Sequence, residues 1–235
     1  LQICLLGPFA VTRASFPITT FESNKVRALL AYLAIEQARP HERSALLGLL
    51  WPDWPEASAR RSLSQALFNL RQALQDHTAD PPYLLISRQT LQWNRQADAF
   101  VDVQACEALL AHMPQNADPA ALTAVSRLYR APLLDQLIID ESEPFQQWLH
   151  LRRTGLQRQV LDALERYADQ LLAEGAPADD RAQAVIEQQL TLEPWREEAH
   201  RQLMRLLTLR GQRKAALNKF EQCRKRMAAE IGVEP

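Results

Sequence analysis

The fold of this chain is decided by residues 56–76, which read EASARRSLSQALFNLRQALQD. Four leucines in this stretch follow one another at intervals of four, three and four residues, so they lie on one stripe of an α-helix. They are Leu63, Leu67, Leu70 and Leu74. The stretch therefore predicts a helix that packs through its leucines and leaves its other side free.

The other side of this predicted helix is polar, partly basic and without acidic residues. At about 100° per residue it carries Arg61, Gln65, Phe68 and Gln72, flanked by Ser64, Asn69 and Arg71. Arginine, asparagine and glutamine match the edges of guanine and adenine in the major groove, and phenylalanine can contact the methyl group of thymine. A helix face that only meets water usually carries glutamates. The pattern therefore favours a helix that reads DNA over a solvated surface helix.

The composition is typical of a globular protein without a membrane segment. Of the 235 residues, 47% are hydrophobic and 23% are charged. The longest apolar run is about seven residues, against the ~18–20 that a transmembrane helix needs. Three distant cysteines, Cys4, Cys106 and Cys223, indicate neither a disulfide framework nor a metal site. Without a signal or transit peptide, we expect a cytoplasmic protein that does not bind membranes.

The net charge of −1 conceals a difference between the two parts of the chain. Residues 1–95 carry 10 Lys and Arg against 7 Asp and Glu, whereas residues 96–235 carry 17 against 21. A mildly basic front part beside an acidic back part suits a small DNA-binding module that is joined to another domain.

Residues 1–95 have the pattern of an α+β winged-helix domain. Apolar and β-branched runs predict strands at the start, and two short β-like runs separated by Arg88-Gln89 predict a hairpin at the end. Helical periodicity lies between them, with Ser23 or Asn24 as the first cap. The expected order is strands within 1–21, helices at about 23–36, 43–50 and 56–76, and a hairpin at about 83–93. In a winged helix of this order the third helix is exposed for recognition.

Residues 96–235 are helical nearly throughout and predict an all-α domain. Its helices of about 12–28 residues are expected to break at Met113–Pro119, Ala131-Pro132, Glu143-Pro144, Gly175–Pro177, Glu193-Pro194 and Arg210-Gly211. A weak repeat of 36 residues ends at Gly175 and Gly211, and Ala216 and Phe220 follow as in a tetratricopeptide repeat (TPR). Such TPR-like helix pairs leave a concave surface for partners.

Five motifs carry a resemblance to a known protein family. They are KVRALLAYL (25–33), LWPD (50–53), ARRSLSQALFNLRQAL (59–74), EPFQQW (143–148) and EIGVEP (230–235). With these motifs the whole chain resembles the SARP-type transcriptional activators. Those proteins join an OmpR-type winged helix to an all-α bacterial transcriptional activator domain. The resemblance implies the same two domains here, over 1–95 and 96–235, and a second domain that continues beyond residue 235.

The resemblance also implies a sequence-specific DNA-binding transcriptional activator whose third helix reads the major groove of double-stranded promoter DNA. We expect DNA contacts from this helix through Arg60, Arg61, Ser64, Gln65, Phe68, Asn69, Arg71 and Gln72, with Arg71 on or near a phosphate. Typical members are more basic where this chain has Asn69-Leu70-Arg71-Gln72. Fewer cations lower the intrinsic affinity, which favours a homodimer on direct repeats.

Two further groups of residues are candidates for DNA contact. Arg88 and Gln89 at the tip of the hairpin are placed to meet the minor groove, whose negative potential attracts arginine. Lys25 and Arg27 begin the first helix, where its dipole can hold phosphate. The alternative is a solvated turn in the first case and a solvated helix start in the second.

The loop between the second and third helices resembles the part of OmpR-type activators that contacts RNA polymerase. Asp53, Trp54 and Glu56 are the expected contact residues, whereas Trp51 is expected in the core. The helical domain is expected to support dimerisation or polymerase contact.

No motif indicates catalysis, a cofactor or a metal site. The five histidines are scattered, and the chain contains no nucleotide-binding, nucleophile-elbow or zinc-protease motif. We therefore expect a protein that is not an enzyme. The alternative function is a TPR-like interaction scaffold whose winged helix does not itself bind DNA.

Overall fold

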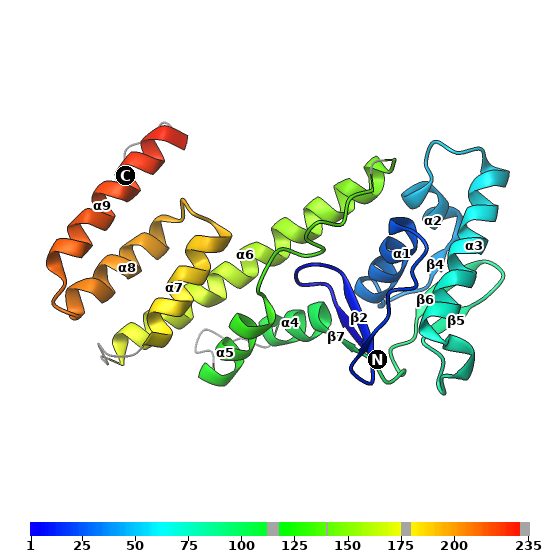
Figure 1. The fold of residues 1–235 in the computed structure, drawn as a ribbon, viewed down its shortest axis with the longest axis horizontal. Coiled ribbons are helices and arrows are strands. Elements are labelled where there is room, and N and C mark those ends of the chain that lie inside the picture. Colours follow the sequence, from blue (N-terminus) through cyan, green and yellow to red (C-terminus); the bar gives the residue numbers. More distant parts are fainter. Residues whose placement is uncertain (112–117, 140, 175–179, 231–235) are drawn as a thin grey trace. The chain divides into compact units, whose positions relative to one another are not determined.

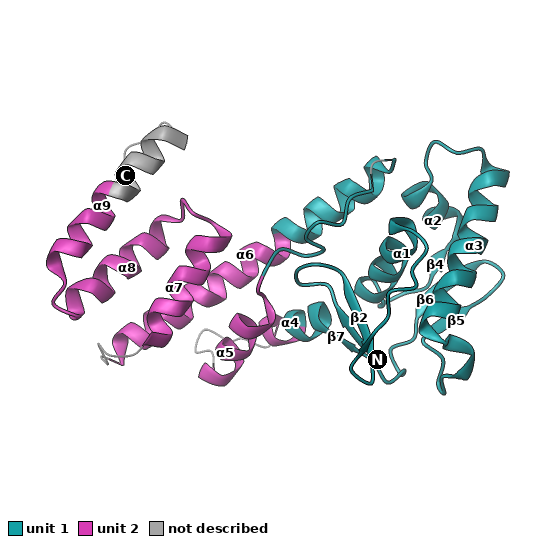
Figure 2. Cartoon of the chain, viewed as in Figure 1, with its two compact units in different colours: residues 1–107, 131–154 teal, residues 108–130, 155–235 magenta. Residues whose placement is uncertain are grey.

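The computed structural model describes residues 1–111, 118–139, 141–174 and 180–230 (Figure 1). These residues form two compact units, which Figure 2 distinguishes by colour. Unit 1 contains residues 1–107 and 131–154, and unit 2 contains residues 108–130 and those from 155 onward. Residues 131–154 thus pack with the front of the chain, while the domain boundary after residue 95 stays a prediction.

The helices and the hairpin of unit 1 follow the predicted order. They are α1 (Asn24–Ile35), α2 (Arg43–Leu50) and α3 (Glu56–Leu74), followed by β5 (Leu84–Ile86) and β6 (Thr90–Trp93). Ser23 caps α1, since its side chain accepts a hydrogen bond from the N–H of Val26. The third helix ends at Gln75, which adopts the left-handed conformation. This arrangement is a winged helix, as the sequence predicts.

The core of the winged helix is built on the leucine stripe. All four leucines of α3 are buried, and Leu70 and Leu74 are completely inaccessible to solvent. The apolar face of α1 lies in the same core, and its members Val26, Leu29, Leu30 and Leu33 are buried as expected. Trp51 is only 3% exposed, which confirms its expected place in the core.

A four-stranded sheet precedes the winged helix, in the order β3-β2-β1-β7. Its strands are β1 (Gln2–Cys4), β2 (Ala10–Arg13), β3 (Phe16–Pro17) and β7 (Phe100–Val101). Strand β7 pairs parallel to β1. The prediction of helix from residue 96 onward is therefore wrong for β7, because a two-residue strand that pairs with the distant start of the chain leaves no periodicity of its own.

Asp102, the first residue of the helix α4 (Asp102–Ala111), connects this helix to the residues that follow β1. Its buried carboxylate accepts hydrogen bonds from the N–H groups of Leu5 and Leu6 at 2.9 Å and from that of Val103 at 2.7 Å. Burial raises the pKa of this carboxyl group, and the three backbone bonds oppose the rise.

A second sheet joins the wing to α2, in the order β4-β6-β5. Strand β4 (His41–Glu42) pairs with β6 and leads directly into α2. The sequence predicts only a turn here, since two residues carry no strand signal. The pairing fixes the start of α2 beside the tip of the hairpin.

Residues 131–154 complete unit 1. The N–H of Leu134 donates to the carbonyl of Leu5 at 2.7 Å, and that of Gly7 donates to Pro132 at 3.1 Å. The first part of α6 (Glu143–Ala173) brings Trp148 against Tyr32 of α1, with ring centroids 4.9 Å apart. Glu143-Pro144 is therefore the start of a helix, where proline is tolerated, and the break lies before it.

Unit 2 is all-α, as predicted. Besides the rest of α6 it contains α5 (Pro119–Leu128), α7 (Asp180–Leu192), α8 (Glu197–Leu209) and α9 (Arg213–Glu230). Helix α8 packs against both α7 and α9. The breaks predicted at Glu193-Pro194 and Arg210-Gly211 separate these helices, and Gly211 has a positive φ of 74°. Most of the breaks at Met113–Pro119 and Gly175–Pro177 lie outside the described residues. Throughout the described part of the chain, no helix has the length and apolar character to span a bilayer.

Candidate nucleic-acid interface

The outer face of α3 presents polar and aromatic side chains to solvent. Its exposed residues are Arg60, Arg61, Ser64, Gln65, Phe68, Arg71 and Gln72. Phe68 is 58% exposed, although its side chain is large and apolar. The one acidic residue of the helix, Glu56, lies in the first turn, where it pairs with Arg60. The face is therefore suited to the edges of bases in a groove, as the sequence predicts.

Asn69 does not belong to this face, and the prediction that it points outward is wrong. It is only 7% exposed. Its side chain donates to the carbonyl of Thr20 and accepts from the N–H of Glu22, both at 3.2 Å. Ala66 and Ala73, three residues before and four after Asn69, are also buried, so these small residues form a second buried row. That alanine spacing is the sequence signal that places Asn69 inside.

Asp76 joins the end of α3 to the wing. This buried carboxylate accepts from the N–H groups of Tyr83 at 2.7 Å and Leu84 at 3.0 Å. It also pairs with Arg71 at 3.4 Å, and the Arg71 side chain stays half exposed. The contact orients Arg71 and couples the position of the wing to that of α3.

The tip of the wing carries Arg88 and Gln89, and both are exposed. The hydroxyl of Ser87 accepts from the N–H groups of Gln89 at 3.1 Å and Thr90 at 2.8 Å, which fixes a tight turn. The two predicted contact residues are thus presented on an ordered turn.

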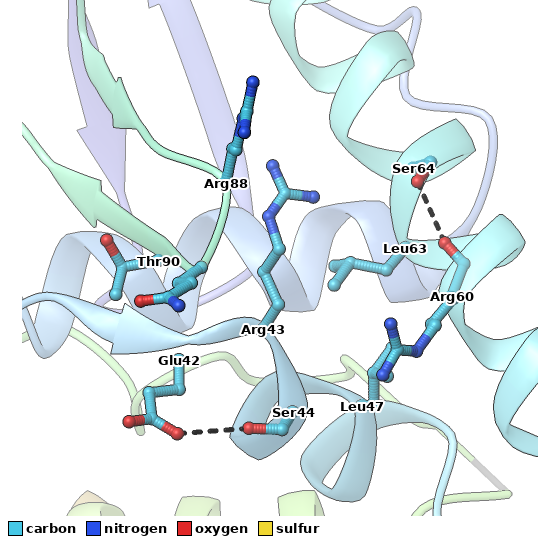
Figure 3. A pocket seen from close by; sticks show the side chains of 10 residues that line it. Glu42, Arg43, Ser44, Leu47, Arg60, Leu63, Ser64, Arg88 and Thr90 are labelled. Atoms are coloured by element: carbon cyan, nitrogen blue, oxygen red, sulfur yellow. Dashed lines mark hydrogen bonds between the residues drawn. The ribbon is translucent and has the colours of Figure 1, made fainter.

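A hollow of about 540 Å³ lies between α2, α3 and the wing tip (Figure 3). Three arginines line it, one from each element: Arg43, Arg60 and Arg88. Leu47 and Leu63 also line it. Glu42 lines the hollow as well. With three arginines against this one carboxylate, the concave surface has an excess of cations and is suited to a phosphate group.

Arg43 is the member of this set that the sequence prediction missed. Its guanidinium donates to the carbonyl of Ser87 through Nε at 3.3 Å and Nη2 at 3.2 Å, which ties the start of α2 to the wing. Arg43 is the first residue of α2. A cation at that end of a helix opposes the helix dipole, and this unfavourable position is the signal that could have identified it.

Lys25 and Arg27 are not free cations at the start of α1. The ammonium group of Lys25 pairs with Glu141 at 3.2 Å, and it lies 5.0 Å from the ring centroid of Trp54. Its side chain is 17% exposed. Arg27 is half-buried and donates to Asn24. Lys25 is therefore engaged within the protein.

The three residues predicted to contact polymerase lie in the loop between α2 and α3, which carries Asp53 and Trp54, and at the first position of α3, which is Glu56. Asp53, Trp54 and Glu56 are exposed, and Trp54 has 42% of its surface open to solvent.

Among the residues that the structure describes, no three His, Cys, Asp or Glu side chains gather in a way that could hold a metal ion.

Comparison with known proteins identifies the family. The model of the bacterial transcriptional activator domain matches residues 96–235, which is more than half of the chain. The chain belongs to the SARP-type family of bacterial transcriptional activators. As a SARP-type protein it joins the winged helix described above to this helical domain.

Two curated relatives of the SARP-type chain are transcriptional regulatory proteins. EmbR from Mycobacterium tuberculosis is 31% identical, over 100% of this chain and 60% of EmbR. MoaR1 from Mycobacterium bovis is 29% identical, over 100% of this chain and 75% of MoaR1. The chain thus spans about three fifths of the length of EmbR.

A solved structure has the same fold as the SARP-type chain. The structure of M. tuberculosis EmbR in complex with a low-affinity phosphopeptide aligns with a TM-score of 0.73 and 26% sequence identity. The alignment covers 100% of this chain and 62% of the EmbR chain. The predicted fold, a winged helix followed by a helical domain, is confirmed.

Proposed function

We propose that this chain is a cytoplasmic, sequence-specific DNA-binding activator whose α3 lies in the major groove of promoter DNA. The observation that carries the proposal is the exposed face of α3, which beyond its first turn has no acidic residue and presents Phe68 to solvent. Gln65 and Gln72 supply bidentate hydrogen bonds to base edges, and Phe68 contacts a thymine methyl group. Arg61 and Ser64 contact base edges or the adjoining sugars.

The hollow beside α3 binds the DNA backbone in this proposal. Arg43 and Arg60 contact one phosphate, and Arg71 contacts a second phosphate from the other end of α3. Gln89 and Arg88 at the wing tip reach the adjacent minor groove. Phosphate contacts of this kind fix the register of the helix, while the bases select the sequence.

Activation follows from contact with RNA polymerase through the α2–α3 loop and the start of α3, where Asp53, Trp54 and Glu56 are exposed. The helical domain supports a homodimer on direct repeats. Linking two weak DNA-binding modules raises the overall affinity, because the second binding event becomes intramolecular. Because α3 carries few cations, a single module is expected to bind DNA weakly, and the higher affinity of the dimer compensates for this.

Selection of bound fragments from genomic DNA with the purified chain tests the proposal. A selected fragment is then titrated by fluorescence anisotropy at two salt concentrations, beside a scrambled fragment of equal length. We expect tighter binding to the selected fragment and a logarithmic salt slope of about −0.9 for each phosphate contacted. No binding, or binding that salt does not weaken, would favour the scaffold alternative.

A further inference from the structure

A second groove, of about 460 Å³, lies on unit 1 beside the α2–α3 loop. Trp51 and Trp54 of the loop line one side of it. Ile138 and Glu141, which come more than eighty residues later in the chain, line another. The groove is therefore composite. The α2–α3 loop, the start of α1 and Ser62, Gln65 and Ala66 of α3 form part of it, and Ile138, Ile139 and Glu141 from the helical half of the sequence supply the rest.

Ile138, Glu141 and Ser142 contact the winged helix through hydrogen bonds and an ion pair. The side chain of Asn24 donates to the carbonyl of Ile138 at 3.1 Å, and Glu141 pairs with Lys25 at 3.2 Å. The hydroxyl of Ser142, which is 1% exposed, donates to the carbonyl of Leu49 in the last turn of α2. Through these contacts Ile138, Glu141 and Ser142 pack against α1 and α2.

The groove has an apolar lining and an acidic rim. Ile138 is 60% exposed and Trp54 is 42% exposed, so both offer large apolar surfaces to a partner. Glu22 and Glu141 are exposed lining residues. The lining cation, Lys25, pairs with Glu141 and lies over the rings of Trp51 and Trp54, so it is enclosed between them. The charge that faces a partner is therefore negative.

We infer that Ile138 and Glu141 complete the polymerase-docking surface, and that its occupant is a basic segment of RNA polymerase that inserts an apolar side chain between Trp54 and Ile138. This inference rests on the proposed function, which assigns polymerase contact to the α2–α3 loop. Complementary charge selects a basic segment, and a half-exposed tryptophan beside an exposed isoleucine is the kind of pair that anchors an interface. An acidic rim repels phosphate, so DNA is disfavoured at the side of the groove formed by Ile138 and Glu141, whereas Gln65 on the α3 side keeps its proposed contact with a base.

The test compares Ile138→Ser with Leu151→Ser as its matched control. Leu151 is 71% exposed on the part of α6 that belongs to unit 1, and it does not line the groove. Each purified variant is titrated with RNA polymerase holoenzyme by biolayer interferometry and with a selected DNA fragment by anisotropy. Melting temperatures verify that each variant folds.

Ile138→Ser is expected to weaken binding to the holoenzyme by about tenfold, the cost of one interface anchor, and to leave DNA affinity unchanged. Glu141→Gln is expected to weaken it less and to reduce its salt dependence, and Leu151→Ser is expected to bind as the wild type does. The inference is overturned if Ile138→Ser binds the holoenzyme normally, or if it loses DNA affinity, which would place the groove in the DNA interface.

Trp54→Ser separates this inference from the proposed function. If Trp54→Ser weakens holoenzyme binding while Ile138→Ser does not, the loop contacts polymerase and Ile138 takes no part. If the wild-type chain binds DNA but not the holoenzyme, both the polymerase contact and this inference are wrong. If it binds no DNA, the proposed function fails by the anisotropy experiment itself.

Discussion

Unit 1 and unit 2 both contain amphipathic helices, but their polar side chains have different surroundings. In unit 2, Arg196 reaches three carboxylates, those of Asp162, Glu165 and Glu193. On α3 of unit 1, the side chains of Gln65, Phe68 and Gln72 make no hydrogen bond, ion pair or ring contact with any residue of the described part of the chain. Arg196 therefore joins helices within unit 2, whereas the side chains of Gln65, Phe68 and Gln72 remain accessible on the surface of α3.

The largest expected effect comes from the buried side of α3. Leu70→Ala removes a fully buried side chain from the stripe on which the winged helix is built, and we expect it to lower the free energy of unfolding by about 2–5 kcal/mol. Urea denaturation measures the loss. Gln72→Ala on the exposed side is the control and should stay within about 0.5 kcal/mol of the wild type. Equal losses in the two variants would show that the sides of α3 are not distinct.

Arg196→Ala tests the use of polar residues in unit 2. The Arg196 side chain is 13% exposed, and its removal leaves three carboxylates close together. We expect a loss of about 2 kcal/mol in unfolding free energy, below that of a fully buried pair because the carboxylates are partly solvated. Arg201→Ala is the matched control, since Arg201 is 61% exposed and pairs with Glu198 alone. Thermal denaturation that does not distinguish the two arginines would contradict the comparison.

Asn69→Ala tests the residue that the sequence pattern placed on the wrong side. The substitution leaves the Glu22 N–H and the Thr20 carbonyl without their partner. A loss of about 1–3 kcal/mol in stability is expected, with an unchanged ratio of specific to non-specific DNA binding in the folded protein. Gln65→Ala is the comparison variant, and it should leave stability unchanged and lower the ratio of specific to non-specific DNA binding. Unchanged stability together with a lost base preference would show that Asn69 turns outward to read a base.

Arg43→Ala gives the smallest expected effect. Because Arg43 is assigned to a phosphate, its removal should weaken binding to every DNA sequence alike and make the salt slope shallower by about 0.9. Anisotropy titrations on a selected and a scrambled fragment measure both quantities. Arg95→Ala, which removes an exposed arginine that does not line the hollow, should leave the slope unchanged. A change confined to the selected fragment would instead make Arg43 a base-reading residue.

The sequence was sufficient to predict elements that are specified locally. The leucine spacing of α3, the Ser23 cap of α1 and the run of α2 from Arg43 to Leu50 all depend on residues within a few turns of one another. The exposed face of α3 was predicted from the leucine spacing, and the wing tip from the two short β-like runs on either side of it. Periodicity reports this kind of order well, because each signal lies inside the element that it predicts.

Contacts between distant segments could not be predicted in this way. Strand β7 exists because Val101 pairs with Ile3, and β4 exists because His41 pairs with Leu91. The place of residues 131–154 in unit 1 depends on similar long-range bonds, such as that between Leu134 and Leu5. The composite groove and the hollow at Arg43 are made by such pairings, which is why sequence spacing alone did not reveal them.

The central claim is that the outer face of α3 reads DNA, and the double variant Gln65→Ala/Phe68→Ala tests it most directly. The measurement is the ratio of the Kd for a scrambled fragment to that for a selected fragment, by anisotropy at one salt concentration. The account predicts that this ratio falls by at least about tenfold, while the melting temperature and the affinity for the scrambled fragment stay at wild-type values. A double variant that keeps the wild-type ratio would contradict it.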